Sequence, residues 1–146
     1  MEEPLKAWYC DVCGEKIEDA SKGYVIWRSA GRTYQGFKII HQGKCDIKSH
    51  PASAALNDFL GDKGLSYCMT FLSLGPVISN SGGAGHCYIQ DFDEFADFVR
   101  RVQVPYYEEA RRLYGNHDLL EALSDANEFY PYVPERMKAL IERYGR

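Results

Sequence analysis

The chain has no apolar run long enough to cross a membrane. Its apolar stretches are short and interrupted by Ser, Gly and Pro, whereas a transmembrane helix needs about 20 consecutive apolar residues. The first residues, Met1 to Pro4, are acidic and lead into no apolar segment, so the pattern of a secretory signal is missing as well. We therefore expect no membrane partner and a cytoplasmic location.

Several catalytic signatures are also missing. The sequence contains no H-E-x-x-H motif, and no H-x-E lies upstream of a P-C-x-x-C, as zinc deaminases require. The Gly-rich stretch from Asn80 to Gly85 is not followed by Lys-Ser/Thr, which excludes a phosphate loop of the nucleotide-hydrolase kind. We assign no catalytic residue and favour a non-enzymatic protein.

What is present is the composition of a folded domain. The 146 residues are 45% hydrophobic and 14% aromatic, which is enough for a core and argues against general disorder. Five cysteines form an odd set in a chain without an export signal. Metal ligation in a reducing compartment explains them better than disulfides do, with Cys68 expected to be a plain buried residue in a helix.

Four of the candidate ligands form two close pairs. Cys10 and Cys13 make C-x2-C, and after 27 residues His41 and Cys45 make H-x3-C. Three thiols and an imidazole in this spacing suit a tetrahedral zinc ion, which we predict as the cofactor. His50 is an alternative to His41 as the fourth ligand. A closed four-ligand site is typical of structural zinc, because catalysis needs an open position for water.

The pattern of apolar residues predicts an α+β fold. Gly23 to Trp27 and Gly36 to His41 read as a hairpin, with Gly36 at a bulge. We expect a zinc-stapled hairpin lobe over 1–50 and a mainly α-helical body over 51–146. The expected helices cover 51–60, 65–72 (largely buried), 92–102 (capped by Asp91), 105–114, 118–123 and 134–144, and two short strands are expected at 77–78 and 87–89.

Residues 8–60 resemble the treble-clef and LIM-like zinc modules. The resemblance rests on the knuckle Cys10-Asp-Val-Cys-Gly14, the hairpin, and a second ligand pair before a helix. It implies a zinc finger with ligands Cys10, Cys13, His41 and Cys45, although the wide spacer and the H-x3-C depart from the usual pattern. The whole chain is similar to small bacterial proteins that pair such a knuckle with a helical tail, and this similarity implies no activity.

The charge is distributed unevenly along the chain. From Ser21 to His50 six basic residues face one acid, a net charge of +5, whereas Pro51 to the C-terminus carries nine basic and fourteen acidic residues. The six basic residues are Lys22, Arg28, Arg32, Lys38, Lys44 and Lys48. Interleaved with the aromatic residues Tyr24, Trp27, Tyr34 and Phe37, they are the candidate contacts of a nucleic-acid-binding alternative.

Three functional hypotheses follow. The first is a binding or adaptor module with a structural zinc and a protein partner. The second is nucleic-acid binding through the basic hairpin. The third is a metal-dependent hydrolase or nuclease with a site near His86, after the Gly82–Gly85 loop. The sequence carries no signal for the oligomeric state.

Overall fold

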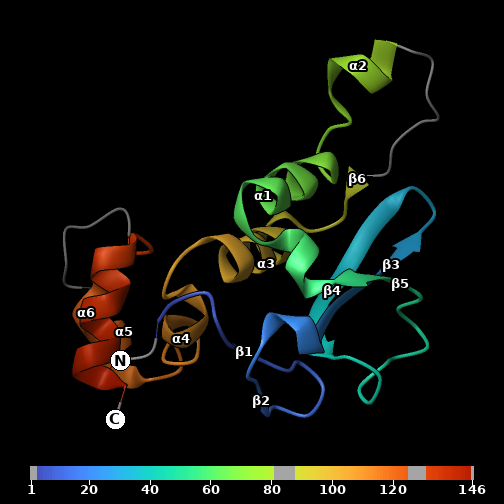
Figure 1. Cartoon of the computed structure of the whole chain (residues 1–146). Helices are drawn as coiled ribbons and strands as arrows, with labels where there is room; N and C mark the ends of the chain where they lie inside the picture. Colours follow the sequence, from blue (N-terminus) through green and yellow to red (C-terminus); the bar gives the residue numbers. More distant parts are fainter. Residues whose placement is uncertain (1–2, 81–87, 125–130, 146) are drawn as a thin grey trace.

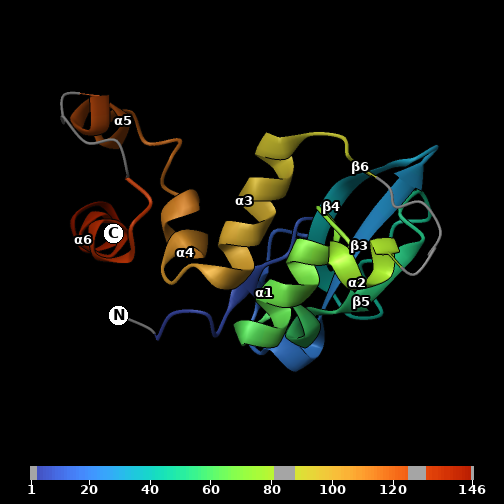
Figure 2. The ribbon, with the colours of Figure 1, turned by 90° about the horizontal axis from the view of Figure 1, so that it is seen from above.

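The computed structural model describes residues 3–80, 88–124 and 131–145, and its fold is a mixed α+β arrangement (Figure 1). A four-stranded sheet lies at one side of the molecule, helices α3 (Phe92–Gln103) and α4 (Tyr107–Arg111) lie in the middle, and α5 (His117–Ser124) and α6 (Pro134–Tyr144) form the opposite side (Figure 2). None of the described helices is long and apolar enough to span a membrane.

The sheet is built around the predicted hairpin. Strands β3 (Gly23–Ala30) and β4 (Thr33–His41) pair antiparallel, and Gly31, with a positive φ of 64°, makes the tight turn between them. Strand β5 (Ala52–Ala55) joins the other edge of β3, and β6 (Tyr88–Ile89) joins β4 in parallel, so the order is β5-β3-β4-β6. A separate two-stranded sheet consists of β1 (Trp8–Tyr9) and β2 (Lys16–Ile17).

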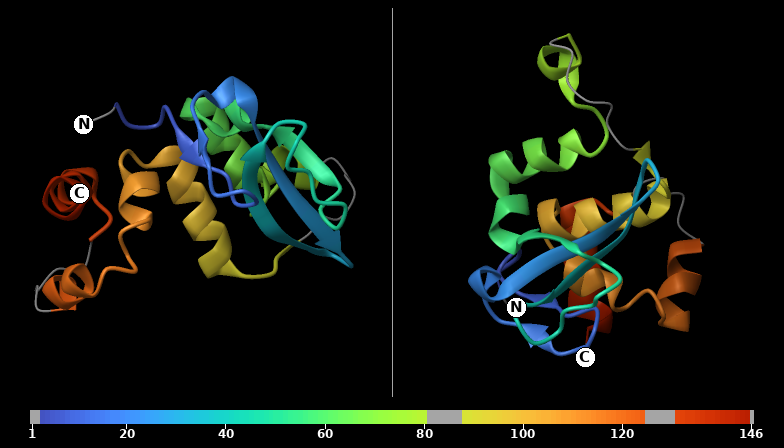
Figure 3. Two further views of the ribbon diagram at one scale, coloured as in Figure 1. Left: turned by 90° about the horizontal axis from the view of Figure 1, so that it is seen from below. Right: turned by 90° about the vertical axis from the view of Figure 1, so that its right-hand side faces the viewer.

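This topology corrects one part of the prediction. The α+β class is confirmed, but the sheet is interleaved with helices and is not a separate N-terminal lobe, because β5 and β6 come from beyond residue 50. The views in Figure 3 show helices α1 (Gly61–Thr70) and α3 packed along the sheet. The division into domains at 1–50 and 51–146 stays a prediction.

Several local predictions are corrected too. The segment 51–60 forms β5 and the 3-10 helix η2 (Leu56–Phe59) rather than an α-helix, and residues 77–78 lie in helix α2 (Gly75–Asn80) rather than in a strand. Asp91 caps α3 as expected, since its side chain accepts from the Glu94 N–H, and Pro134 opens α6. A short 3-10 helix, η1 (Ala20–Lys22), precedes β3.

The main core lies between the sheet and the helices α1 and α3. Trp27 stacks on Phe37 at a ring distance of 5.8 Å, and Phe37 in turn stacks on Phe98 of α3 at 5.1 Å. Phe59 and Phe71 complete this aromatic cluster with edge-to-face contacts to Trp27. The buried thiols of Cys10 and Cys45 belong to the same core. A second, smaller cluster joins α4 to α6 through Tyr107, Ala110 and Met137.

The expected bulge in the hairpin is present at Gly36. The register of β3 and β4 shifts between Ile26 and Arg28, Gly36 has a φ of 74°, and its amide donates to Glu94 Oε1 of α3. A methyl group on Gly36 would lie 2.5 Å from Nε2 of His50, which therefore closes over this glycine.

Gly36→Ala should consequently lower the free energy of unfolding by about 2 kcal/mol, from left-handed backbone strain and the His50 contact together. The matched control is Gly31→Ala, where φ is also positive but nothing lies within 4 Å of the added carbon, so only the backbone strain of about 1 kcal/mol applies. Urea denaturation of both variants measures the difference. Equal losses would show that His50 does not pack on Gly36.

Candidate metal centre

The first pair of candidate ligands lies in a tight turn after β1. The Gly14 N–H donates to the Cys10 carbonyl at 3.0 Å, and Gly14 has a φ of 78°, a conformation that favours glycine. The backbone N–H groups of Val12 and Cys13 point at Cys10 Sγ, at 3.4 and 3.5 Å. The turn therefore presents both thiols on one side and stabilises a thiolate at Cys10.

The hairpin brings the second pair to the first. His41 is the last residue of β4, and Cys45 follows in the loop that leads to β5. Nδ1 of His41 lies 3.4 Å from Cys13 Sγ and 3.8 Å from Cys45 Sγ. The four ligand atoms of Cys10, Cys13, His41 and Cys45 all lie within 4.8 Å of one another.

These separations fit a tetrahedral zinc ion. With Zn–S bonds of about 2.3 Å and Zn–N bonds of about 2.0–2.1 Å, neighbouring ligands should be roughly 3.5–3.8 Å apart. Of the Sγ–Nδ1 distances, 3.8 Å lies in this range and 3.4 Å is just below it. A set of three sulfurs and one imidazole also favours zinc over the harder ions that prefer oxygen. The cluster can therefore hold a metal ion such as zinc.

A backbone carbonyl fixes the orientation of the His41 ring. Nε2 lies 3.1 Å from the carbonyl oxygen of Lys16 in β2, and a carbonyl can only accept, so Nε2 carries the proton. Nδ1 is the ring nitrogen that faces the sulfurs of Cys13 and Cys45, and it is the one that would bind a metal ion. Metal-bound histidines are commonly oriented in this way by a partner on the other ring nitrogen.

The protein environment shifts two of the thiol pKa values in opposite directions. Burial acts to raise the pKa of Cys10, but the N–H donors of Cys13 and Val12 and the neighbouring His41 outweigh it, and the pKa falls to about 6. Burial, followed by the nearby Cys10 and Cys13 sulfurs, raises the pKa of Cys45 to about 11. Three thiolates repel one another at this distance, and a bound dication removes that conflict.

This arrangement predicts a pH-dependent metal affinity. With a pKa of about 11, Cys45 is protonated at neutral pH in the metal-free protein and must lose its proton to bind zinc. The apparent zinc affinity should therefore rise at least about tenfold per pH unit between about pH 6 and 8. Competition with a chromophoric chelator, corrected for the chelator's own protonation, measures this slope. A flat profile would contradict metal binding through Cys45.

A buried arginine connects the knuckle to the helices. Arg101 of α3 is 2% exposed and donates to Asp11 Oδ2 at 2.7 Å and to the Tyr9 carbonyl at 3.0 Å. Its Nε donates to Glu108 of α4, which is 4% exposed, at 2.7 Å. The Asp11 carboxylate also accepts from the Ile39 N–H of β4 at 2.8 Å, so one network joins the knuckle, the hairpin and both helices.

Nothing in the sequence indicates this network, because a glutamate in a helix is ordinarily found on the solvent-facing side. Glu108 is buried instead, because Arg101 supplies a compensating charge from the preceding helix. No local pattern marks the pair, because Arg101 and Glu108 belong to different helices: α3 ends at Gln103, and α4 begins after Tyr106, whose φ is positive at 72°. Of the three charged residues in this network, only Asp11 lies within a motif recognised in the sequence, the Cys10–Gly14 knuckle.

The sequence also singled out His50, Cys68 and His86. His50 packs on Gly36 and is not part of the Cys10–Cys45 cluster, so the structure brings His41 and not His50 to the thiols. Cys68 is buried in α1, as predicted. His86 and the Gly82–Gly85 loop lie outside the described residues.

The basic hairpin residues are largely exposed, but their aromatic neighbours are not all available for stacking. Lys22, Arg28, Arg32, Lys44 and Lys48 are exposed and Lys38 is half-buried. Burial, followed by the charges of Lys38 and Arg28, lowers the pKa of His50, and the charge of Glu94 acts in the opposite direction. Trp27 and Phe37 are core residues, and Tyr24 and Tyr34 are half-buried.

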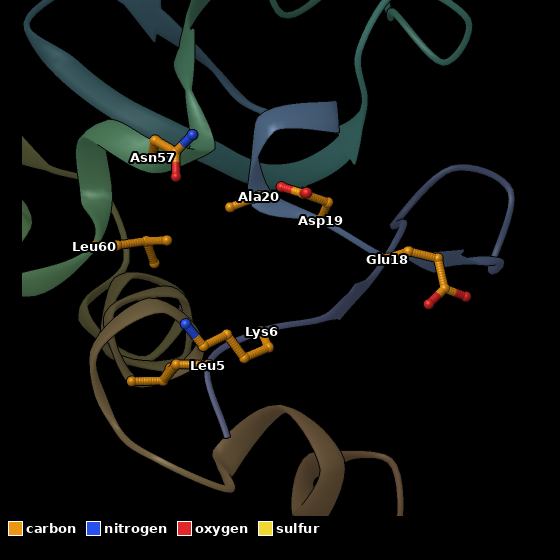
Figure 4. Close-up of a pocket in the computed structure, with 7 residues that line it drawn as sticks. All are labelled: Leu5, Lys6, Glu18, Asp19, Ala20, Asn57 and Leu60. Atoms are coloured by element: carbon orange, nitrogen blue, oxygen red, sulfur yellow. The ribbon is translucent and has the colours of Figure 1, made fainter. Parts of the chain in front are cut away.

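A separate hollow lies between the N-terminal segment, η1 and η2 (Figure 4). It has a volume of about 320 Å³, and the amine of Lys6 and the amide of Asn57 face it, whereas Glu18 points away. Asp19, also at its wall, is occupied in capping η1 through the Ser21 N–H. The described residues that line it include no Ser, Thr, Cys or His.

Comparison with known proteins does not extend this description. The chain matches no family model, and no match was found among the curated proteins or the solved structures.

Proposed function

We propose that this chain is a zinc-binding protein of the treble-clef type, in which a structural zinc holds a surface for a protein partner. The observation that carries the proposal is the Cys3His cluster, with all four ligand atoms within 4.8 Å of one another. Four protein ligands complete a tetrahedron and leave no position for a reacting water. In this proposal the zinc is structural, and the function of the protein is to bind a protein partner.

The contacts around the cluster support a structural role. The His41 ring is held by Lys16, the Cys10 thiol by two backbone amides, and Asp11 by Arg101 and Ile39. Each contact fixes an element of the fold, namely β2, the knuckle, β4 or α3, relative to the metal. Loss of the ion should therefore change surfaces well beyond the knuckle.

Two measurements on one preparation test this proposal. Native mass spectrometry should find one zinc per chain, and affinity capture with cross-linking should recover a partner that the Cys13→Ser variant no longer retains. Cys13 is the exposed member of the cluster, so this substitution disturbs the core least. Absence of zinc, or partner binding that is indifferent to its removal, would contradict the proposed function.

Nucleic-acid binding is a second candidate, and the exposure of five of the six basic hairpin residues favours it. Phosphate contacts of this kind weaken steeply with salt. Retention of a single-stranded oligonucleotide at low salt, reduced in an Arg28→Ser/Lys38→Ser variant, supports this candidate. No retention at about 20 mM salt removes it.

A further inference from the structure

Helix α1 exposes apolar residues that sequence reasoning expected to be buried. Leu65 and Met69 of α1 and Leu72, two residues past its end, follow the spacing i, i+4 and i+7 of one helix face, yet each is at least 40% exposed. On the neighbouring helix, Phe92, the first residue of α3, is 72% exposed. These side chains form an uncovered stripe within the described part of the molecule.

The stripe borders a groove between α1 and α3. Its volume is about 260 Å³, and it is lined by Cys68, Met69, Leu72, Phe92, Phe95, Ala96 and Val99. The two helices run antiparallel, because Gln103 at the end of α3 donates to the carbonyls of Phe59 and Gly61 at the start of α1. An apolar channel between two helices is the shape that receives a third, amphipathic helix.

Two exposed acidic residues of the same helices, which do not themselves line the groove, favour a basic partner. Asp62 lies three residues before Leu65 on the same side of α1, and Asp93 follows Phe92; both are exposed. Neither is matched by a cation of α1 or α3. Lys63 faces a different hollow, Arg100 lies 4.4 Å over the Tyr132 ring, and Arg101 is buried against Glu108.

A second copy of the chain would bring its own Asp62 and Asp93 to this face, and like charges would oppose each other. A basic helix would instead place its cations against them. Asp62 and Leu72 are ten residues apart, which corresponds to about 15 Å at the rise of a helix, so the occupant needs about three turns.

We propose that the α1–α3 groove binds an amphipathic helix of a protein partner, with apolar residues at i, i+4 and i+7 and Lys or Arg at both ends. This inference rests on the proposed function, since it names the surface and the partner class of the binding module. The metal fixes α3 through Asp11 and Arg101, and α3 forms one wall of the groove.

The experiment uses the full-length zinc-loaded protein and a fluorescein-labelled lysine–leucine amphipathic peptide of about four turns. Fluorescence anisotropy should show binding that weakens with salt, and amide chemical shifts should move along α1 and α3. Met69→Lys should reduce the affinity at least tenfold, and Asp62→Lys/Asp93→Lys should reduce it severalfold and flatten the salt dependence. Leu120→Lys, an equally exposed apolar position on α5, is the matched control and should bind as the parent does.

Three outcomes would overturn the proposal. They are equal binding of a glutamate–leucine peptide of the same pattern, shifts confined to other elements, and a dimer in sedimentation that Met69→Lys dissociates. Zinc content measured on the same samples separates the two claims. A protein that holds one zinc but does not bind the peptide refutes the groove alone, whereas a protein without zinc refutes the proposed function.

Discussion

Cys10→Ser should abolish stoichiometric zinc binding and unfold the N-terminal half of the chain. Structural zinc contributes about 10–16 kcal/mol of apparent binding free energy in small finger peptides, so loss of one ligand should cost more than about 4 kcal/mol of stability. Cys10 and Cys45 are part of the main core together with Phe59 and Phe98. The unfolding should therefore include the sheet, and hydrogen exchange at β3 and β4 measures it.

The control for this variant is Cys68→Ala. Cys68 is equally buried but lies in α1, outside the ligand cluster. Removing its sulfur should cost about 1 kcal/mol and leave the zinc content at one per chain. If Cys10→Ser kept its zinc and its protection from exchange, the ligand assignment would be wrong.

Arg101→Met should be the second most damaging substitution, with a loss of about 3–5 kcal/mol. The change leaves the Glu108 carboxylate buried without its partner, and it removes the donors to Asp11 and the Tyr9 carbonyl. The knuckle would then lose its link to α3 and α4. Chemical denaturation gives the loss of stability, and exchange at Asp11 and Val12 reports the loosened knuckle.

A matched pair elsewhere separates this effect from the loss of any arginine. Arg111 binds Asp97 at 2.9 Å, but both side chains are about one-third exposed, so Arg111→Met should cost only about 1 kcal/mol or less. Adding Glu108→Leu to Arg101→Met should recover part of the stability, because an apolar pair avoids the unpaired charge. Equal losses for Arg101→Met and Arg111→Met would contradict the coupling through Arg101.

The sequence predicted the features that local chemistry determines. The spacing of Cys10, Cys13, His41 and Cys45 indicated one cluster, and the Asp91 cap and Pro134 located two helix starts. The bulge at Gly36 was also expected, since a glycine within an apolar strand favours it.

Features that depend on distant partners were not predicted. Strand β6 reaches β4 across more than 45 positions of sequence, and such pairing has no local signal. The local sequence does not show that Glu108 is buried, because its ion-pair partner Arg101 lies in the preceding helix. The stripe of Leu65, Met69 and Leu72 has the periodicity of a buried helix, and periodicity alone cannot tell a core contact from a surface that awaits a partner.

The coordination of the metal is the most direct test of the account. Zinc-edge X-ray absorption of the purified, zinc-loaded protein should show three sulfur ligands at about 2.3 Å and one nitrogen ligand at about 2.0–2.1 Å. In Cys13→Ser one sulfur should disappear from the shell. A shell with fewer than three sulfurs in the unsubstituted protein, or with a bound water, would contradict a closed structural site at Cys10, Cys13, His41 and Cys45.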